Sequence, residues 1–546
     1  MLLDVGLNMS SVHYAYVVVL QSLIYLAVAL SVLVAADRII HVIQYIYWRH
    51  CEKLRSKRPE DRYNFADLPE IVSALLIIHV TSFSKHIYTR SLETATSPIA
   101  NKPLLLFPTK QSTYGHLYPK VAVQLPMFNE RAVCQQIIDC VCDMTWPDRC
   151  IYIQVLDDST DEVTRQLVDE KVLEWKEKGK NIEAIRRTNR DGYKAGAMKE
   201  AMDSVAGYEY IAVFDADFQP SSDFLFQTIP YLEGNPKVGY VQTRWTFLNA
   251  NESYLTKAQE ISLNFHVKCE QYVHFASGSF FNFNGTAGVW RRECIKTSGG
   301  WDARTTVEDM DLSLRAHLRG WKAVFLKDIT CKNELPSSFF AYRKQQHRWC
   351  CGPMQLWMKA SKDIWKSNIP VHKKLYLNFC YFGVRKFGTH LVTLGFFCTL
   401  VPLSIFTPEV HVPFWALVYL PIAIAMCTAS FTPRGWLHCV IYVLFENAMG
   451  IVRLWAVISG LLNLKRAKEW VVTTKMGSSD GRPATGVMPP GLRSCKLYTG
   501  EFIMSIFVLF AAVYGIFAVH RWDFSIFLSL QGKIRANQKQ NKNWKA

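Results

Sequence analysis

The chain has 546 residues, of which 50% are hydrophobic, 13% aromatic and 20% charged, and its net charge is +16. This length accommodates one large domain together with a membrane part, and the charged fraction is somewhat low for a soluble protein. The basic residues cluster beside long apolar runs and the sequence contains no recognisable nucleic-acid-binding module, so an anionic membrane surface and a phosphate-bearing substrate explain the charge better than nucleic acid does.

The first apolar run predicts a membrane anchor. Residues 14–36 are long enough to cross a bilayer, which takes about 20 helical residues. Lys and Arg are absent before this run and frequent after it, from Arg38 to Arg58. The positive-inside rule therefore predicts a signal anchor, with Met1 on the lumenal side and the residues after the run in the cytosol.

Later apolar runs predict further membrane segments. Residues 387–406 and 412–430 predict a hairpin of two spans, and residues 498–519 predict one more. Residues 436–464 are also apolar, but they include charged side chains, which are costly at the middle of a membrane. They therefore predict an amphipathic helix at the membrane surface.

A mixed α/β domain is predicted between the anchor and the hairpin. Residues 121–125, 151–156 and 210–214 are short apolar runs, and each is followed by polar residues. Helical patterns over residues 130–143 and 162–178 separate them. Strands that alternate with helices indicate a doubly wound, mostly parallel sheet, in which ligands bind at the carboxyl ends of the strands.

Two carboxylates follow the third predicted strand. Asp215 and Asp217 are two residues apart, so their side chains share one side of an extended segment. Such a pair of hard oxygen ligands suits Mg²⁺ or Mn²⁺ bridging a diphosphate. The alternative is a solvated turn, which is the commoner role of this pattern when it stands alone.

A second acidic pair, Asp157 and Asp158, ends the second predicted strand. A carboxylate there can accept hydrogen bonds from a base or a ribose, and the alternative is a cap for the following helix. Lys194 lies between Gly192 and Gly196, which let the backbone approach a phosphate that the lysine contacts. Surface loops often have the same composition.

Two later motifs add an acid–base group and a basic–aromatic pair. Glu308 and Asp309 open an amphipathic helix, where Asp309 fits a general base for an acceptor hydroxyl or a charge that favours the helix dipole. Arg348 offers a guanidinium to phosphate, and Trp349 offers a ring on which a sugar stacks. The alternative for Trp349 is a core tryptophan.

Together these motifs resemble those of the membrane-embedded, inverting family 2 glycosyltransferases that make β-linked polysaccharides, and most closely those of the cellulose-synthase-like A and C proteins. The resemblance implies an α/β domain of GT-A type, with a doubly wound mixed sheet, inserted between transmembrane helices. It covers residues 118–477 and rests on the phrases QLPMFNER (124–131), QVLDDSTD (154–161), GYKAG (192–196), FDADFQP (214–220), FNGTAGVW (283–290), RTTVEDMD (304–311), QQHRW (345–349) and WVVTTK (470–475).

The resemblance also implies the site residues. It gives catalytic roles to Asp157, as a nucleotide contact, and to Asp309, as the base, and it makes Asp215 and Asp217 the ligands of Mg²⁺ or Mn²⁺ at the diphosphate. The other substrate-binding residues that it implies are Glu130, Asp158, Lys194, Gln345, Arg348, Trp349, Trp470, Thr473 and Lys475.

From the apolar runs and the resemblance together, we expect a multi-pass Golgi membrane protein whose catalytic domain faces the cytosol. Its partners are a nucleotide-sugar donor, the growing polysaccharide and the lipid bilayer; whether it forms a homo-oligomer or needs an accessory protein stays open. The expected parts are an anchor with a juxtamembrane helix (1–52), a cytosolic linker (53–117), the catalytic domain (118–370), a transmembrane hairpin with an interfacial helix (371–464), a gating-type loop (465–496), and a last transmembrane helix with a basic tail (497–546).

Two donor sugars remain as alternatives, mannose and glucose. The A-type relatives mostly make β-1,4-mannan or glucomannan from GDP-mannose, whereas the C-type relatives make a β-1,4-glucan from UDP-glucose and are usually longer at both ends. The compact chain favours the A type. A transporter is disfavoured because the sequence has no internal repeat, and a non-catalytic scaffold is disfavoured because every acidic motif residue is retained.

Overall fold

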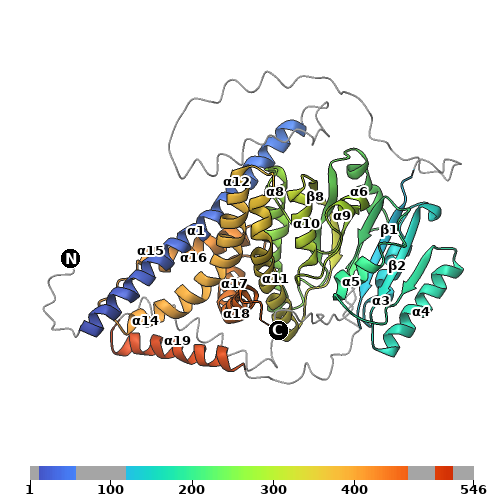
Figure 1. Ribbon diagram of the computed structural model, residues 1–546. Helices are drawn as coiled ribbons and strands as arrows, with labels where there is room; N and C mark the ends of the chain where they lie inside the picture. Colours follow the sequence, from blue (N-terminus) through green and yellow to red (C-terminus); the bar gives the residue numbers. More distant parts are fainter. Residues whose placement is uncertain (1–10, 57–117, 465–497, 521–546) are drawn as a thin grey trace, which may run out of the picture.

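The computed structural model describes residues 11–56, 118–464 and 498–520. Figure 1 shows two parts side by side: an α/β domain, and a bundle of apolar helices that includes α1 (Ser11–Ser56) and α19 (Thr499–Phe517). α1 runs the length of the bundle and continues beside the α/β domain. The predicted linker beyond residue 56 and the predicted loop over residues 465–496 lie outside the described residues.

An eight-stranded mixed sheet forms the centre of the α/β domain, in the order β3-β2-β1-β4-β7-β6-β8-β5. The strands are β1 (Val121–Met127), β2 (Ile151–Asp157), β3 (Ile182–Ile185), β4 (Tyr210–Val213), β5 (Phe218–Gln219), β6 (Val238–Phe247), β7 (Gly288–Arg291) and β8 (Lys322–Asn333).

The three strands predicted from the sequence are β1, β2 and β4, and they are neighbours in the sheet. β1 pairs in parallel with both β2 and β4, so the carboxyl ends of the three strands meet at one edge. Every residue of β1 is buried, as expected for a parallel strand covered on both faces. The other half is mixed, because β7 is antiparallel to β4 and β6.

Helices cover both faces of the sheet. α3, α4 and α6 bury Ile137, Val168 and Leu225 in the core on one face, and α5 and α10 bury Met198 and Leu312 on the other. The helical segments of this domain are η3 (Asp148–Cys150), α3 (Cys134–Cys142), α4 (Glu162–Glu177), α5 (Tyr193–Glu200), α6 (Phe224–Glu233), α7 (Tyr254–Asn264), η4 (Phe265–Glu270), α8 (Gln271–Ala276), α9 (Arg292–Thr297), α10 (Glu308–Leu318) and α11 (Phe339–Lys366).

The first two predicted helices are present, but one begins later than expected. α4 starts after Asp161, whose side chain accepts a hydrogen bond from the backbone N–H of Thr164 (3.0 Å) and so caps the helix. α3 starts at Cys134 rather than at residue 130, because Asn129 adopts a left-handed conformation (φ 51°) and the chain turns before the helix begins.

Among the described residues, three helices are long and apolar enough to cross a membrane: Ser11–Glu52, Val371–Ile405 and Thr499–Phe517. They include the predicted anchor, the first arm of the predicted hairpin and the last predicted span. The segments of this bundle that follow α11 are α12 (Val371–Leu375), η5 (Tyr376–Gly388), α13 (Thr389–Leu391), η6 (Val392–Leu400), α14 (Val401–Ile405), α15 (Phe414–Leu417), α16 (Tyr419–Ala429), α17 (Trp436–Ala448) and α18 (Gly450–Leu461).

Two predicted membrane segments differ in shape from the helices that were expected, and their position relative to the membrane stays a prediction. The second arm of the hairpin is the shorter apolar helix Phe414–Ala429, which by itself falls below the about 20 residues that a perpendicular span needs. The single interfacial helix predicted over residues 436–464 is instead a pair, α17 and α18, bent by 45°. Arg453 in α18 is buried and donates to Glu446 and to Gln346 of α11, so its charge is paired rather than held at the surface.

A buried ionic cluster joins the anchor to the rest of the protein. The guanidinium of Arg385 in η5 donates to Asp37 of α1 (2.8 and 3.2 Å). It also contacts the imidazoles of His41 and His274 (2.9 and 2.8 Å), and His274 lies in α8 of the α/β domain. One arginine therefore links the anchor, a second membrane helix and the α/β domain.

Candidate active site

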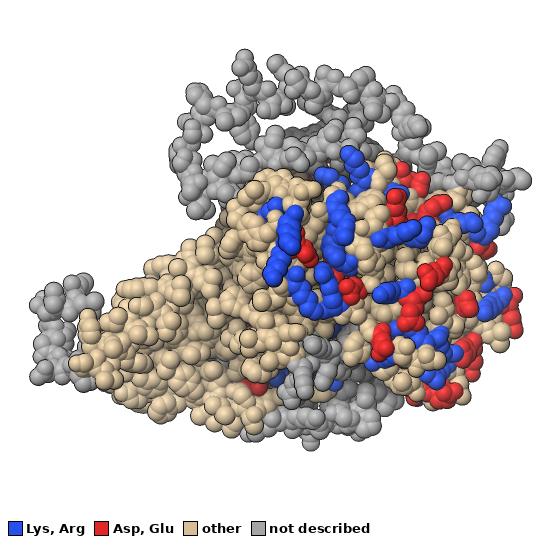
Figure 2. All heavy atoms as spheres, in the orientation of Figure 1, with Lys and Arg blue, Asp and Glu red and all other residues tan. Residues whose placement is uncertain are grey.

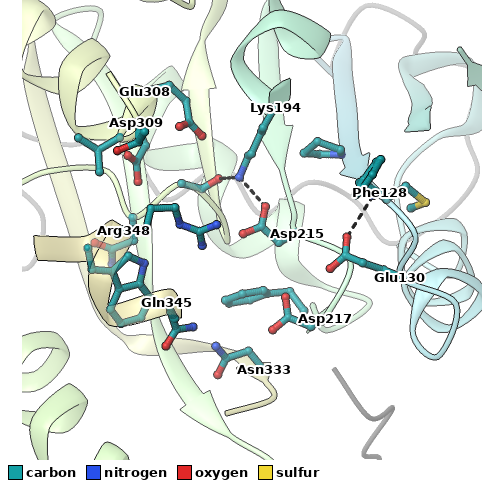
Figure 3. Close-up of a pocket in the computed structure, with 18 of the residues that line it drawn as sticks. Phe128, Glu130, Lys194, Asp215, Asp217, Glu308, Asp309, Asn333, Gln345 and Arg348 are labelled. Carbon is teal, nitrogen blue, oxygen red and sulfur yellow. Dashed lines mark hydrogen bonds and ion pairs between the residues drawn. The ribbon is translucent and has the colours of Figure 1, made fainter. Parts of the chain in front are cut away.

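An open cleft lies at the carboxyl ends of β1, β2 and β4. The start of α10, one face of α11 and the end of β8 close its other sides (Figure 3). The predicted site residues that line it come from six motifs far apart in the sequence; they are Glu130, Asp158, Lys194, Asp215, Asp217, Asp309, Gln345, Arg348 and Trp349. The topology of the sheet therefore brings most of the predicted site together.

Lys194 connects helix α5 to the end of β4. Its ammonium contacts the carboxylate of Asp215 and donates to the carbonyl of Gly285 (2.8 Å). Burial opposes the charge on Lys194, but the carboxylates of Asp215 and Glu308 outweigh burial and hold its pKa above the ordinary value. Gly285 has a φ of +82°, and a Cβ there would lie 3.0 Å from Oδ2 of Asp309, so glycine permits this close approach.

Asp215 and Asp217 offer oxygen ligands for a divalent cation. The backbone N–H of Asp215 donates to the hydroxyl of Thr286 (2.8 Å), which fixes the start of this turn. In Figure 3 both carboxylates point into the cleft, and Asn333 from the end of β8 lies beside Asp217. Within the described ranges no three His, Cys, Asp or Glu side chains converge as a metal site. The pair fits Mg²⁺ or Mn²⁺ when phosphate oxygens and water complete the coordination.

The first turn of α10 holds two acids, Glu308, which is buried, and Asp309, which is partly buried. The backbone N–H of Met310 donates to Oδ1 of Asp309 (2.7 Å). Burial, and then the adjacent charge of Glu308, raise the pKa of Asp309 to about 7. This value places Asp309 where a group can both accept and release a proton near neutral pH. Glu308 was part of the recognised motif but had no predicted role; it lines the cleft, and burial raises its pKa too.

Three predicted site residues of α11 form another wall of the cleft. Arg348 is partly buried, and loss of water lowers its pKa while the carboxylates of Glu308 and Asp215 oppose that shift. An arginine remains charged under either influence. Gln345 and Trp349 line the cleft on the same helix. Trp349 also packs against the hydrophobic core on one face of the sheet. Its side chain therefore contributes both to the core and to the wall of the cleft.

The two carboxylates at the end of β2 separate. Asp158 lines the cleft and accepts from the guanidinium of Arg187 (2.9 Å). Asp157 is not among the residues that line the cleft; it accepts from Arg186 (2.9 Å) and from the backbone N–H of Ser159 (3.0 Å). In this conformation Asp157 therefore holds the turn, and Asp158 is the carboxylate presented to a ligand.

Sequence reasoning missed several residues that line the cleft. The guanidinium of Arg190 lies 3.3 Å from the ring centroid of Phe128, so a cationic and an aromatic group form one wall beside Glu130. Asn333 ends β8 and follows the same rule of polar residues at strand ends. Applying that rule to every strand would have found Asn333, whereas no local signal marks Arg190. The predicted contacts Trp470, Thr473 and Lys475 lie outside the described residues.

Comparison with known proteins agrees with this arrangement. A family model described as "Glycosyltransferase like family 2" matches residues 119–352. The chain is 44% identical over 418 residues to the probable glucomannan 4-beta-mannosyltransferase 1 of Arabidopsis thaliana, covering 75% of both chains. It is 45% identical over 422 residues to glucomannan 4-beta-mannosyltransferase 1 of Cyamopsis tetragonoloba, covering 76% of this chain and 80% of that one. Among solved structures, the mannosyltransferase PcManGT from Pyrobaculum calidifontis in complex with GDP-Man and Mn²⁺ aligns with a TM-score of 0.44 at 16% identity, over 80% of this chain and 100% of that chain.

The mixed sheet, the paired carboxylates after β4 and the two adjacent acids at the start of α10 define a GT-A glycosyltransferase. Apolar helices adjoin its catalytic domain, in keeping with a membrane enzyme. The chain belongs to the family 2 glycosyltransferases, in the group of the cellulose-synthase-like A glucomannan 4-beta-mannosyltransferases.

Proposed function

We propose that this protein is an inverting, processive glycosyltransferase that extends a β-1,4-linked mannan or glucomannan with mannose from GDP-mannose. The observation that carries the proposal is the convergence of Lys194, Asp215 and Asp309 in one cleft of a chain about three quarters of which matches glucomannan 4-beta-mannosyltransferases. This set provides a base and a cationic contact for a diphosphate within reach of each other.

In the proposed reaction, Asp309 removes the proton from the hydroxyl at the end of the acceptor chain. The acceptor oxygen forms a bond to the anomeric carbon of the donor sugar while the bond from that carbon to the nucleoside diphosphate breaks, so a single displacement converts an α-linked donor into a β-linkage. Glu308 supports this role, because its charge helps to raise the pKa of Asp309 to about 7, near the operating pH.

Cationic groups stabilise the leaving diphosphate. Lys194 has a buried side chain and Arg348 is partly buried, so both act where charge–charge interactions are stronger than in water. A Mg²⁺ or Mn²⁺ ion bound by Asp215 and Asp217 supplies further neutralisation when present.

The remaining predicted residues hold the two substrates. Gln345 and Trp349 receive the acceptor end, since a tryptophan face stacks on sugar rings. On the nucleotide side we assign Asp158 and Glu130, with Asp157 supporting the turn that presents Asp158. We keep Trp470, Thr473 and Lys475, which lie outside the described residues, as further substrate contacts in this proposal.

The setting of the proposed reaction is the Golgi membrane, with the catalytic domain in the cytosol. Basic residues on the far side of the first span support that orientation. The growing polysaccharide and the bilayer are then the partners beside the donor.

The test is to supply detergent-solubilised protein with GDP-mannose or UDP-glucose separately and to digest the product with β-mannanase or β-glucanase. We expect polymer from GDP-mannose that β-mannanase cleaves, and none from Asp309→Asn protein purified in the same way. Polymer from UDP-glucose alone would replace the mannan proposal with a glucan synthase. Absence of product from either donor, while a related synthase works in the same assay, would instead favour a scaffold.

A further inference from the structure

The corner where α11 ends and α12 begins exposes large apolar side chains. The last turns of α11 bury Ala360 and Ile364 against the neighbouring helices. The opposite face of the same turns carries Met358 and Trp365, which are 59% and 45% exposed. These two residues are seven apart, so they lie on one stripe of the helix.

Lysines surround this apolar stripe. Lys362 and Lys366 are exposed on the same outer face of α11, and Lys373 and Lys374 follow in α12. The ammonium of Lys374 donates to the carbonyl of Trp365 (2.8 Å), which ties the two helices together. We call Lys362, Trp365, Lys366, Lys373 and Lys374 the basic corner. One acidic residue, Asp363, lies at its edge, 3.9 Å from Arg304.

The basic corner continues the apolar surface of a membrane helix. α12 is the first turn of the candidate span Val371–Ile405. Along this span Val371 and Phe379 are 64% and 60% exposed, and their spacing of eight places them on one face. Figure 2 shows that the helix bundle presents an almost uncharged surface, and that Lys and Arg side chains begin where this surface meets the α/β domain.

We propose that the basic corner binds the phosphate-bearing headgroups of anionic phospholipids in the leaflet next to the catalytic domain. Tryptophan prefers the boundary between hydrocarbon and headgroups, and lysine extends its alkyl stem along apolar surface while its ammonium reaches the phosphate layer. The charge and the apolar stripe together favour a lipid surface over an acidic soluble protein, which would leave Trp365 and Val371 without an apolar environment. This inference does not depend on the donor or on the product of the enzyme.

The test compares lipid binding by the full chain and by a charge-neutral variant. Detergent-solubilised protein is titrated with phosphatidylserine or phosphatidylcholine in mixed micelles, and lipid-bound species are counted by native mass spectrometry. We expect selective retention of phosphatidylserine by the wild type. Each lysine near a membrane surface contributes about a fivefold change in affinity, so Lys362→Gln/Lys366→Gln should weaken retention by about 25-fold.

Matched variants test whether lipid retention depends on the lysines of the basic corner or only on the net charge of the protein. Lys176→Gln/Lys178→Gln removes the same charge at the end of α4 and should bind as the wild type does, and Lys362→Arg/Lys366→Arg should keep retention. Thermal melting in neutral detergent checks that every variant is folded. Equal retention by the wild type and the charge-neutral variant, or equal binding of phosphatidylcholine, would overturn the proposal. Full competition by millimolar inorganic phosphate would identify a soluble phosphate site instead and would also overturn it.

Discussion

Lys194 and Asp215 form an ion pair at the floor of the cleft, although one belongs to helix α5 and the other follows strand β4. The same ammonium donates to the carbonyl of Gly285, so it holds three segments of the chain at the point where the diphosphate is proposed to bind. A cation bound by Asp215 would share this carboxylate with Lys194. With such a cation in place, the pair would favour a ligand that brings additional negative charge.

Replacing Lys194 should impair the transfer step. We expect Lys194→Gln to lower kcat/KM for the nucleotide sugar by about 100-fold or more, the usual effect of removing one group that stabilises developing negative charge. Lys199→Gln, an exposed position on the same helix, is the matched control and should retain activity. Initial rates at varied donor concentration make the comparison, and near-normal kcat/KM for Lys194→Gln would remove the residue from the site.

The activity should depend on pH through Asp309. Burial and the charge of Glu308 raise the pKa of Asp309 to about 7, and only the deprotonated form can accept a proton. We therefore expect kcat/KM to fall as the pH drops through about 7 and to level off above it. Glu308→Gln removes one cause of the raised pKa, so the acidic limb should move to lower pH. A pH–rate profile unchanged in Glu308→Gln would contradict this coupling.

Metal removal should stop polymer synthesis. If Asp215 and Asp217 hold Mg²⁺ or Mn²⁺, EDTA should abolish incorporation of labelled sugar and either cation should restore it. Asp217→Ala should reduce incorporation by at least about 100-fold and should not recover with added metal, since a lost ligand leaves leaving-group charge uncompensated. Full activity in EDTA would show that Lys194 and Arg348 stabilise the leaving diphosphate without a metal ion.

The Arg385–Asp37 pair should contribute to stability. Breaking a buried ion pair leaves an unpaired charge and typically costs about 3–5 kcal/mol, so Asp37→Asn should lower the melting temperature in detergent clearly. Arg49→Gln disrupts the exposed pair with Glu52 and should change stability by about 1 kcal/mol or less. The double variant Asp37→Asn/Arg385→Gln should recover part of the loss. Equal melting temperatures for the two single variants would show that Arg385 finds compensation from His41 and His274.

Glycan mapping tests the orientation of the membrane part. Asn251, in an N-x-S sequence, is exposed on the catalytic domain and should carry no glycan if that domain faces the cytosol. Asn284 lines the cleft and is a poorer reporter. Mass spectrometry of the protein from a eukaryotic membrane makes the measurement, and a glycan on Asn251 would reverse the proposed topology.

Local patterns predicted three of the four neighbouring parallel strands, β1, β2 and β4, but not the short strand β3. β1, β2 and β4 are short apolar runs that end at polar residues, and such runs need no distant partner to be recognised. The antiparallel strand β7 was not predicted, because Gly288–Arg291 is only part of a longer mixed segment and its pairing with β4 and β6 depends on contacts far along the chain. The burial of Arg453 in α18 escaped prediction for a related reason: its hydrogen-bond partner Gln346 belongs to α11, 107 residues earlier in the chain.

The sequence by itself determined which chemical groups are available: the acids after the strands, the lysine between two glycines, the arginine and tryptophan of α11, and apolar runs of spanning length. Only the tertiary structure decided how they act, because burial and neighbouring charge are properties of packing. It separated Asp158, which faces the cleft, from Asp157, which holds a turn. It also placed Glu308 beside Asp309 in a buried site, where two like charges and loss of water raise a carboxyl pKa that the sequence alone would leave near 4.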